Sequence, residues 1–128
     1  MLTTADADLL IHRHLGETSR ANHSRFVGYI MRQLAGVFAA PAELWEVVGL
    51  CHDLNFFQTS QDWSQHGLLT VKWLGDCIPT DAQHAIAAHD RRTGVYADTL
   101  LADMLKAADA IAIIDLSWGA ARSARRTK

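Results

Sequence analysis

Apolar residues recur along this chain at intervals of three and four, which is the period of an amphipathic helix. The pattern predicts a short helix over residues 5–15 and a longer one over about 19–39. A third helix is expected to run from Pro41, a residue that suits the first turn, to His52. The apolar stripe of the second helix also includes a histidine, since it consists of His23, Val27, Ile30, Met31, Leu34 and Phe38.

The stretch after His52 breaks this periodicity, so residues 54–62 are expected to form a loop. A fourth helix is predicted to start near Trp63 and to end where Gly75 and Pro79 interrupt the pattern. One face of this helix would carry His66, Leu69, Thr70 and Trp73.

The remaining pattern predicts two further helices. Residues 80–83 have the form of a capping box, which would open a fifth helix carrying His84 and His89. After another loop, a last helix is expected over about 100–119. No strand-like alternation or hairpin motif interrupts the series. The sequence therefore predicts an all-α fold, a compact single-domain bundle of about five to six helices over residues 1–128.

The amino-acid composition limits which binding partners and which cellular compartment we expect for this protein. The 128 residues are 49% hydrophobic and carry a formal net charge of -2, so no basic field favours a nucleic-acid polymer. Residues 120–128 are locally basic and are expected to form a flexible tail. Two cysteines are too few for a disulfide framework, and the N-terminus lacks the features of a signal peptide. Because no apolar run approaches the ~20 residues of a membrane span, we expect a soluble, cytoplasmic protein with no membrane partner.

Histidines and aspartates supply the candidate chemistry, because several fall at the core-facing edge of separate predicted helices. They are His23, the doublet His52–Asp53, His66, His89 and Asp109. Each alone has a structural explanation: a histidine on an apolar face is often a hydrogen-bonded core residue, and Lys106 could neutralise Asp109. As a set they are more specific, because imidazole and carboxylate together suit manganese, iron, cobalt, nickel or zinc. His84 is expected to be a core or supporting residue, and His12 and His14 to be exposed.

The order of these residues, His23…His52-Asp53…Asp109, resembles the HD-domain superfamily of metal-dependent phosphohydrolases, over most of the chain. The segment 20-RANHSRFVGYI-30 is similar to the family's first histidine helix. The segment 49-GLCHDLN-55 is similar to its name-giving doublet, and 107-AADAI-111 to the segment of its last ligand. The resemblance implies a metal site made of His23, His52, Asp53 and Asp109.

Two further segments, 66-HGLLTV-71 and 86-IAAHDRRTG-94, are similar to those that supply histidines in two-metal members of the family. This similarity implies a second ion held by His66 and His89, with Asp53 bridging, and leaves open whether one or two divalent ions bind. The chain departs from the family pattern at Asn55 and Thr70, where glycine is more common, and at Asp90, where a second histidine often stands.

The resemblance implies a phosphohydrolase acting on a nucleotide or other small phosphate ester through a metal-activated water, with Asp53 in the catalytic role. Two divalent ions held by neutral histidines and two aspartates would leave a charge of about +2, which favours an anionic substrate. Candidate phosphate contacts are Arg20, Arg91 and Lys106. For Arg91 and its neighbour Arg92, a solvated loop is the competing interpretation.

Two other functions use the same residues. The ligand set also resembles mixed-valent di-iron oxygenases of the HD type, which cleave phosphonates or oxidise polyols, so metal identity and oxygen dependence must separate the two. The short chain leaves little room for the substrate-covering elements of an oxygenase. A non-enzymatic ligand-binding module that kept its metal shell is the third possibility, and the complete ligand set argues against it.

Aromatic residues leave two questions open. Phe56, Phe57 and Trp63 follow the doublet closely and could form an apolar wall for a substrate or belong to the core. Three others, Trp45, Trp118 and Phe38, could be core or interface residues. A homodimer is expected from base rates alone.

Overall fold

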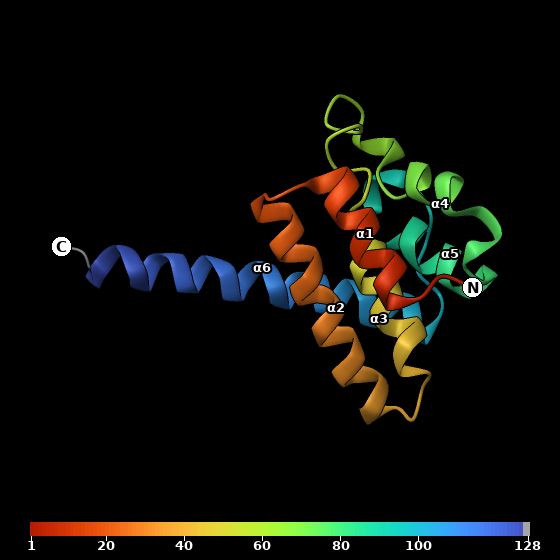
Figure 1. The fold of residues 1–128 in the computed structure, drawn as a ribbon, viewed down its shortest axis with the longest axis horizontal. Coiled ribbons are helices and arrows are strands. Elements are labelled where there is room, and N and C mark those ends of the chain that lie inside the picture. Colours follow the sequence, from red (N-terminus) through yellow and green to blue (C-terminus); the bar gives the residue numbers. More distant parts are fainter. Residues whose placement is uncertain (127–128) are drawn as a thin grey trace.

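The chain folds into a bundle of helices, and the computed structural model describes residues 1–126, with side chains through residue 115. Six α-helices, three short 3-10 helices and no strand make up the described residues, which confirms the all-α prediction. In chain order they are α1 (Thr4–Leu15), α2 (Ser19–Val37), α3 (Ala42–Cys51), η1 (Trp63–Gln65), α4 (Leu68–Leu74), η2 (Gly75–Cys77), α5 (Thr80–Ala88), η3 (Arg91–Thr93) and α6 (Leu100–Arg126). Figure 1 shows α3 at the centre of this arrangement.

Helices α2 and α3 approach each other closely where two glycines meet. A Cβ atom on Gly49 would lie 2.8 Å from the Cα atom of Gly28 and 2.9 Å from the carbonyl oxygen of Val27. A Cβ atom on Gly28 would lie 2.7 Å from a methyl carbon of Leu50. Because neither glycine has a side chain, the two backbones can lie closer than larger residues would allow.

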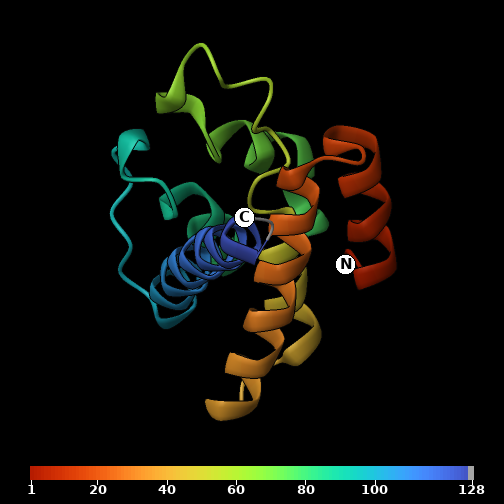
Figure 2. The same ribbon diagram turned by 90° about the vertical axis from the view of Figure 1, so that its left-hand side faces the viewer.

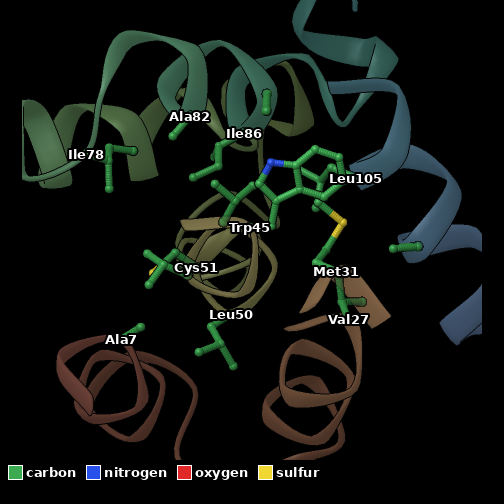
Figure 3. Close-up of a cluster of buried hydrophobic side chains, with 14 of the residues drawn as sticks. Ala7, Val27, Met31, Trp45, Leu50, Cys51, Ile78, Ala82, Ile86 and Leu105 are labelled. Carbon is green, nitrogen blue, oxygen red and sulfur yellow. The ribbon is translucent and has the colours of Figure 1, made fainter. Parts of the chain in front are cut away.

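The hydrophobic core lies around α3 and receives side chains from α1, α2, α5 and α6 (Figure 3). Trp45 of α3 is 4% exposed and therefore belongs to this core, not to a free surface. Phe38 is 44% exposed, and the side chain of Trp118 lies outside the described part. Cys51 and Cys77 are both free thiols, as expected from their number and spacing.

Two predicted helix starts differ from the structure by one residue. Pro41 precedes α3 as its N-cap, with Ala42 as the first helical residue. The predicted capping box at 80–83 does not form, because Pro79 is the N-cap and the Gln83 side chain donates to the carbonyl of Gly75 instead. A capping box forms at the start of α1, where the Thr3 and Asp6 side chains each accept from the other's backbone N–H.

The last helix, α6, is longer than expected. It continues through residues 120–126, where the sequence suggested a tail, and residues 127–128 lie outside the described residues. Figures 1 and 2 show its N-terminal part against the bundle and its C-terminal part extending beyond it. Neither α6 nor any other helix in the described part combines the length and apolar character needed to cross a bilayer.

Candidate metal centre

Most of the candidate ligands lie where helices end. His52 directly follows α3, His89 directly follows α5, and His66 directly follows η1. At a helix end the backbone can turn, so a side chain there can point into a shared space instead of along a helix face. His23 and Asp109 lie within α2 and α6, two helices that pack against each other. The prediction that His66 lies on a long fourth helix is therefore wrong, because α4 begins only at Leu68.

Asp53 lies at the centre of the cluster, and each of its carboxylate oxygens faces a different pair of histidines. Oδ1 is 2.8 Å from Nε2 of His66 and 3.6 Å from Nε2 of His89. Oδ2 is 3.7 Å from Nε2 of His23 and 3.6 Å from Nε2 of His52. The Asp53 side chain is only 2% exposed. A buried carboxylate in this position can bridge two neighbouring cation sites.

Asp109 adds a second carboxylate on the side of α2 and α3. Its Oδ1 lies 2.7 Å from Nε2 of His23 and 3.3 Å from Nε2 of His52. The ligand atoms of His23, His52 and Asp109 lie within 4.8 Å of one another, and so do those of His52, Asp53 and His89. These two overlapping groups contain five of the six residues that the sequence suggests as ligands, and the sixth, His66, joins them through Asp53.

Main-chain carbonyls orient two of the histidine rings. Nδ1 of His52 donates to the carbonyl of Gly49 at 2.6 Å, and Nδ1 of His89 donates to the carbonyl of Ile86 at 2.6 Å. Each carbonyl lies three residues earlier, in the last turn of the same helix. With Nδ1 so engaged, Nε2 of each ring faces Asp53, which is how a second hydrogen-bond partner commonly presents a histidine to a metal.

The ring of His66 is oriented by a side chain instead of a main-chain carbonyl. Its Nδ1 lies 3.0 Å from the hydroxyl oxygen of Thr59. That hydroxyl donates to the carbonyl of Asn55 at 3.0 Å, so its oxygen is left to accept the N–H of His66. Thr59 is 2% exposed, although it lies in the loop between α3 and η1. Sequence reasoning missed Thr59, because a threonine within a polar loop has no periodicity to mark it as buried.

Gly67 is a second residue that the sequence analysis did not single out. Its φ of +90° is in the region that favours glycine. A Cβ atom there would lie 2.6 Å from the carbonyl oxygen of Ile86 and 3.2 Å from the His89 ring. The missing side chain allows the segment after His66 to lie directly against the end of α5. In the sequence, Gly67 could have been found only from its position directly after the candidate ligand His66.

Buried charges shift the pKa values in this cluster. Burial lowers the pKa of His52, but Asp53 and Asp109 outweigh it and raise that pKa to about 9. Burial raises the pKa of Asp53, yet the surrounding imidazoles, led by His52, hold it well below its ordinary value. Burial likewise raises the pKa of Asp109, but the neighbouring imidazoles of His23 and His52 outweigh it and lower that pKa. The carboxylates therefore stay ionised and require a positive partner.

The donor set fits a divalent transition metal ion. Nε2 of His52 is buried, has no hydrogen-bond partner within the described residues, and lies near both carboxylates. A buried polar atom without a partner is costly, unless it binds a proton or a cation. Imidazole nitrogens and carboxylate oxygens are ligands that manganese, iron, cobalt, nickel and zinc accept.

A pocket of about 400 Å³ opens onto the cluster. Arg20 forms an ion pair with Asp53, and its guanidinium carbon lies 4.1 Å from the ring centroid of Phe56. Phe57, in contrast, is 46% exposed and does not line the pocket. The lining residues are Arg20, Asp53, Phe56, Trp63, His66, His89, Asp90, Arg92, Asp109 and Ile113. Arg20, Phe56 and Trp63, which the sequence suggests as substrate contacts, all line this pocket.

Two predicted substrate contacts lie elsewhere. Arg91 and Lys106 are exposed and outside the pocket lining, and Arg92 lines the pocket instead of Arg91. Asp90 explains the difference, because its carboxylate accepts the backbone N–H of Arg92 at 2.9 Å and also pairs with the Arg92 guanidinium in the pocket lining. Lys106 makes no ion pair with Asp109 in the described part of the chain; His23 and His52 balance that carboxylate.

The other histidines lie apart from the cluster. Nε2 of His84 is 2.8 Å from the Asp98 carboxylate, so it anchors the segment that leads into α6. His12 is exposed, as expected. His14 stacks on Trp73 with ring centroids 4.6 Å apart, so the expectation that it is exposed is wrong.

Comparison with known proteins gives one match. The model of a protein family described as the HD domain matches residues 20–114, which is most of the chain. Searches of curated proteins and of solved structures found no match. The matched range includes the whole His/Asp cluster, and an HD domain implies divalent metal binding, which agrees with the donor set.

Proposed function

The chain belongs to the HD-domain family, which typically consists of metal-dependent hydrolases, and from this premise we propose that it hydrolyses a nucleotide or another small phosphate ester. One observation carries the proposal: the two oxygens of Asp53 face two histidine pairs at the floor of a pocket. His23, His52, Asp53 and Asp109 would hold one divalent ion, and His66, His89 and Asp53 the second. Such ions lower the pKa of a bound water and polarise a phosphoryl oxygen.

The protein's own groups supply orientation and binding. Hydrogen bonds at Nδ1 keep the rings of His52 and His89 turned toward Asp53, so the donor atoms are placed before substrate arrives. Asp53 is the residue in the catalytic role, because it touches both halves of the centre. Its low pKa keeps it ionised at neutral pH and able to bridge.

Arg20 is the best-placed phosphate contact. Its side chain is 28% exposed, reaches the pocket, and is held against Asp53 and the Phe56 ring. A guanidinium can bind two phosphate oxygens at once, which a lysine cannot do. The aromatic faces of Phe56 and Trp63 in the same pocket suit the apolar or planar part of an ester.

The proposed partner is a small phosphate-containing molecule, and neither a nucleic-acid polymer nor a membrane is part of the proposal. A cytoplasmic location and a homodimer remain expectations from the sequence.

A pair of aspartate variants tests the function. Asp53→Ala is expected to abolish metal-stimulated hydrolysis of an aryl phosphate, because both halves of the centre lose a carboxylate oxygen. Asp98→Ala is the matched control, since the Asp98 carboxylate pairs with the outlying His84 and is largely exposed. Hydrolysis that persists in Asp53→Ala at the rate of the control would contradict the proposed site.

The same preparation separates hydrolysis from oxygenation, which uses the same residues. Protein loaded with Mn²⁺ is expected to release phosphate equally with and without oxygen. If turnover requires iron and consumes oxygen, the activity is that of a di-iron oxygenase and the hydrolase proposal fails.

A further inference from the structure

Three residues outside the ligand set form a connected group in the lining of the pocket, which we name the clasp: Trp63, Asp90 and Arg92. The Asp90 carboxylate accepts from Nε of Arg92 at 3.0 Å and from Nη2 at 2.7 Å, so the two side chains pair through a fork. The Arg92 guanidinium carbon lies 4.6 Å from the ring centroid of Trp63. All three residues line the pocket.

Each end of the clasp is close to a histidine proposed for the second ion. Asp90 directly follows His89 in the chain. Trp63 packs edge-on against His66, with ring centroids 5.4 Å apart. The two histidine rings themselves lie 4.9 Å apart. The clasp therefore joins the segment that carries His66 to the segment that carries His89.

The two segments have different mechanical support. His89 follows α5, and the adjacent η3 is fixed to that helix because the Thr93 hydroxyl donates to the carbonyl of Ala87 at 2.8 Å. His66 follows the loop 54–65. Leu54 anchors the start of this loop in the core and Phe56 packs against Arg20, but most of residues 57–65 are exposed, and the side-chain hydrogen bonds of the loop stay within 54–66 in the described structure. Arg92 reaches across from the fixed side and stacks on Trp63, which is in the less supported segment.

We propose that the clasp is a positioning device that sets the distance between His66 and His89 for the second metal ion. The inference rests on the two-ion centre of the proposed function. A planar guanidinium held by a carboxylate fork has few orientations available, so it fixes the Trp63 ring more firmly than a lysine could. Trp63, Asp90 and Arg92 act through the histidines and do not bind the ion themselves.

Arg92→Ala distinguishes positioning from simple electrostatics by the sign of its effect. Removing a positive charge and leaving Asp90 unpaired would strengthen cation binding if charge alone mattered. If the clasp positions the ligands, the second ion binds more weakly, by the roughly 10–100-fold typical for lost support around a metal site. Stepwise Mn²⁺ binding, followed by calorimetry and by the Mn²⁺ paramagnetic resonance signal, measures both steps.

The expected result is a first step unchanged in Arg92→Ala and a second step weakened about tenfold or more. Arg92→Lys should weaken it as well, because the charge remains but the fork and the stacking are lost. Trp63→Phe, which keeps an aromatic face, should retain more affinity than Trp63→Leu. Arg32→Ala is the charge-matched control, since Arg32 pairs with Glu46 on the exposed surface away from the pocket.

The outcomes separate the clasp from the function on which it rests. Two normal binding steps in Arg92→Ala, or a tighter second step, would overturn the clasp and leave the two-ion centre intact. A wild-type protein that binds a single ion would overturn the two-ion centre, and the positioning role with it. Equal weakening of both steps in Arg92→Ala would show a general loss of structure and would also contradict the proposal.

Discussion

His52 is fully buried beside two ionised carboxylates, and this surrounding sets how the metal-free centre responds to pH. Asp53 and Asp109 overcome the effect of burial and raise its pKa to about 9. At neutral pH the ring therefore carries a proton in the metal-free protein. A metal can bind Nε2 only after that proton leaves.

Metal binding is therefore expected to release protons at pH 7 and to become tighter as the pH rises toward 9. Calorimetry of Mn²⁺ binding in buffers with different ionisation enthalpies would measure the number of protons released. The expected number is close to one if His52 dominates. Binding heats that do not depend on the buffer would contradict the protonated state of His52.

The hydroxyl group of Thr59 leads to a second prediction about a single residue. Thr59→Val keeps the shape of the side chain but removes the oxygen that accepts from Nδ1 of His66. The His66 ring then loses its fixed orientation, and we expect affinity for the second ion to fall by roughly 10–100-fold. Thr59→Ser keeps the hydroxyl and should retain most of the affinity. The Mn²⁺ titration compares the two, and equal affinities would argue against the support role.

Residue types predicted much of the cluster, because imidazoles and carboxylates near apolar residues need partners. Thr59 and Gly67 were missed as supporting residues because no periodic pattern indicates the contacts on which their roles depend. Arg91 was favoured over Arg92 since nothing in the sequence shows which way η3 turns.

At the scale of elements, the contact between α2 and α3 relates the positions of His23 and His52. Gly49→Ala would place a methyl group 2.8 Å from Gly28 Cα, where only backbone atoms are available to move. Overpacking of this kind costs about 1–3 kcal/mol, so the free energy of unfolding should fall by that amount. Urea unfolding monitored by circular dichroism measures the change.

Gly36→Ala is the matched control for this prediction. It makes the same substitution within α2, where a Cβ atom would meet nothing within 4 Å. Alanine is favoured over glycine in a helix, so this variant should be as stable as wild type or more stable by up to about 1 kcal/mol. Equal destabilisation by both substitutions would show that close helix packing is not the cause.

Helices with a clear apolar period, such as α2 and α3, were predicted within a few residues. The incorrect helix predictions lie in segments where the hydrophobic residues have no regular period. The segment 54–67 folds through turns, a 3-10 helix and single hydrogen bonds, so the pattern misplaced His66 on a helix. The end of α6 was placed too early, at about residue 119 instead of Arg126.

For the whole molecule, opposing pKa shifts predict where the metal-free protein is most stable. The pKa of His52 is raised above its unfolded value, so its stabilisation is complete below about pH 6.5 and is lost as the pH rises through 9. The pKa values of Asp53 and Asp109 are lowered, so their stabilisation is present above about pH 4 and is lost on acidification. Thermal unfolding of metal-free protein should show maximal stability between about pH 4 and 6.5.

Added metal should restore the stability that the metal-free protein loses at higher pH. An ion that binds only the folded chain stabilises it by about 2.7 kcal/mol when its free concentration is 100 times Kd. The increase in melting temperature on adding Mn²⁺ should therefore be larger at pH 8 than at pH 6. A chelator should cancel the increase at both values. An increase that did not depend on pH would contradict the coupling of metal and proton at His52.

The convergence of six ligands from five segments was predictable only through the order of the motif, since the residues span 23–109 in sequence. Periodicity showed which faces are buried but not which helix ends meet. The pocket, the central position of Asp53 and the contacts among Trp63, Asp90 and Arg92 all depend on that meeting.

The central claim is that this buried His/Asp cluster is a divalent metal centre, and the most direct test counts the ions that it holds. Wild-type protein and Asp53→Ala are dialysed against Mn²⁺, freed of loosely bound ions, and analysed for metal and protein content. The account predicts two ions per wild-type chain and a loss of both from Asp53→Ala. A wild-type chain that retains no ion, or an Asp53→Ala variant that retains as many as wild type, would contradict it.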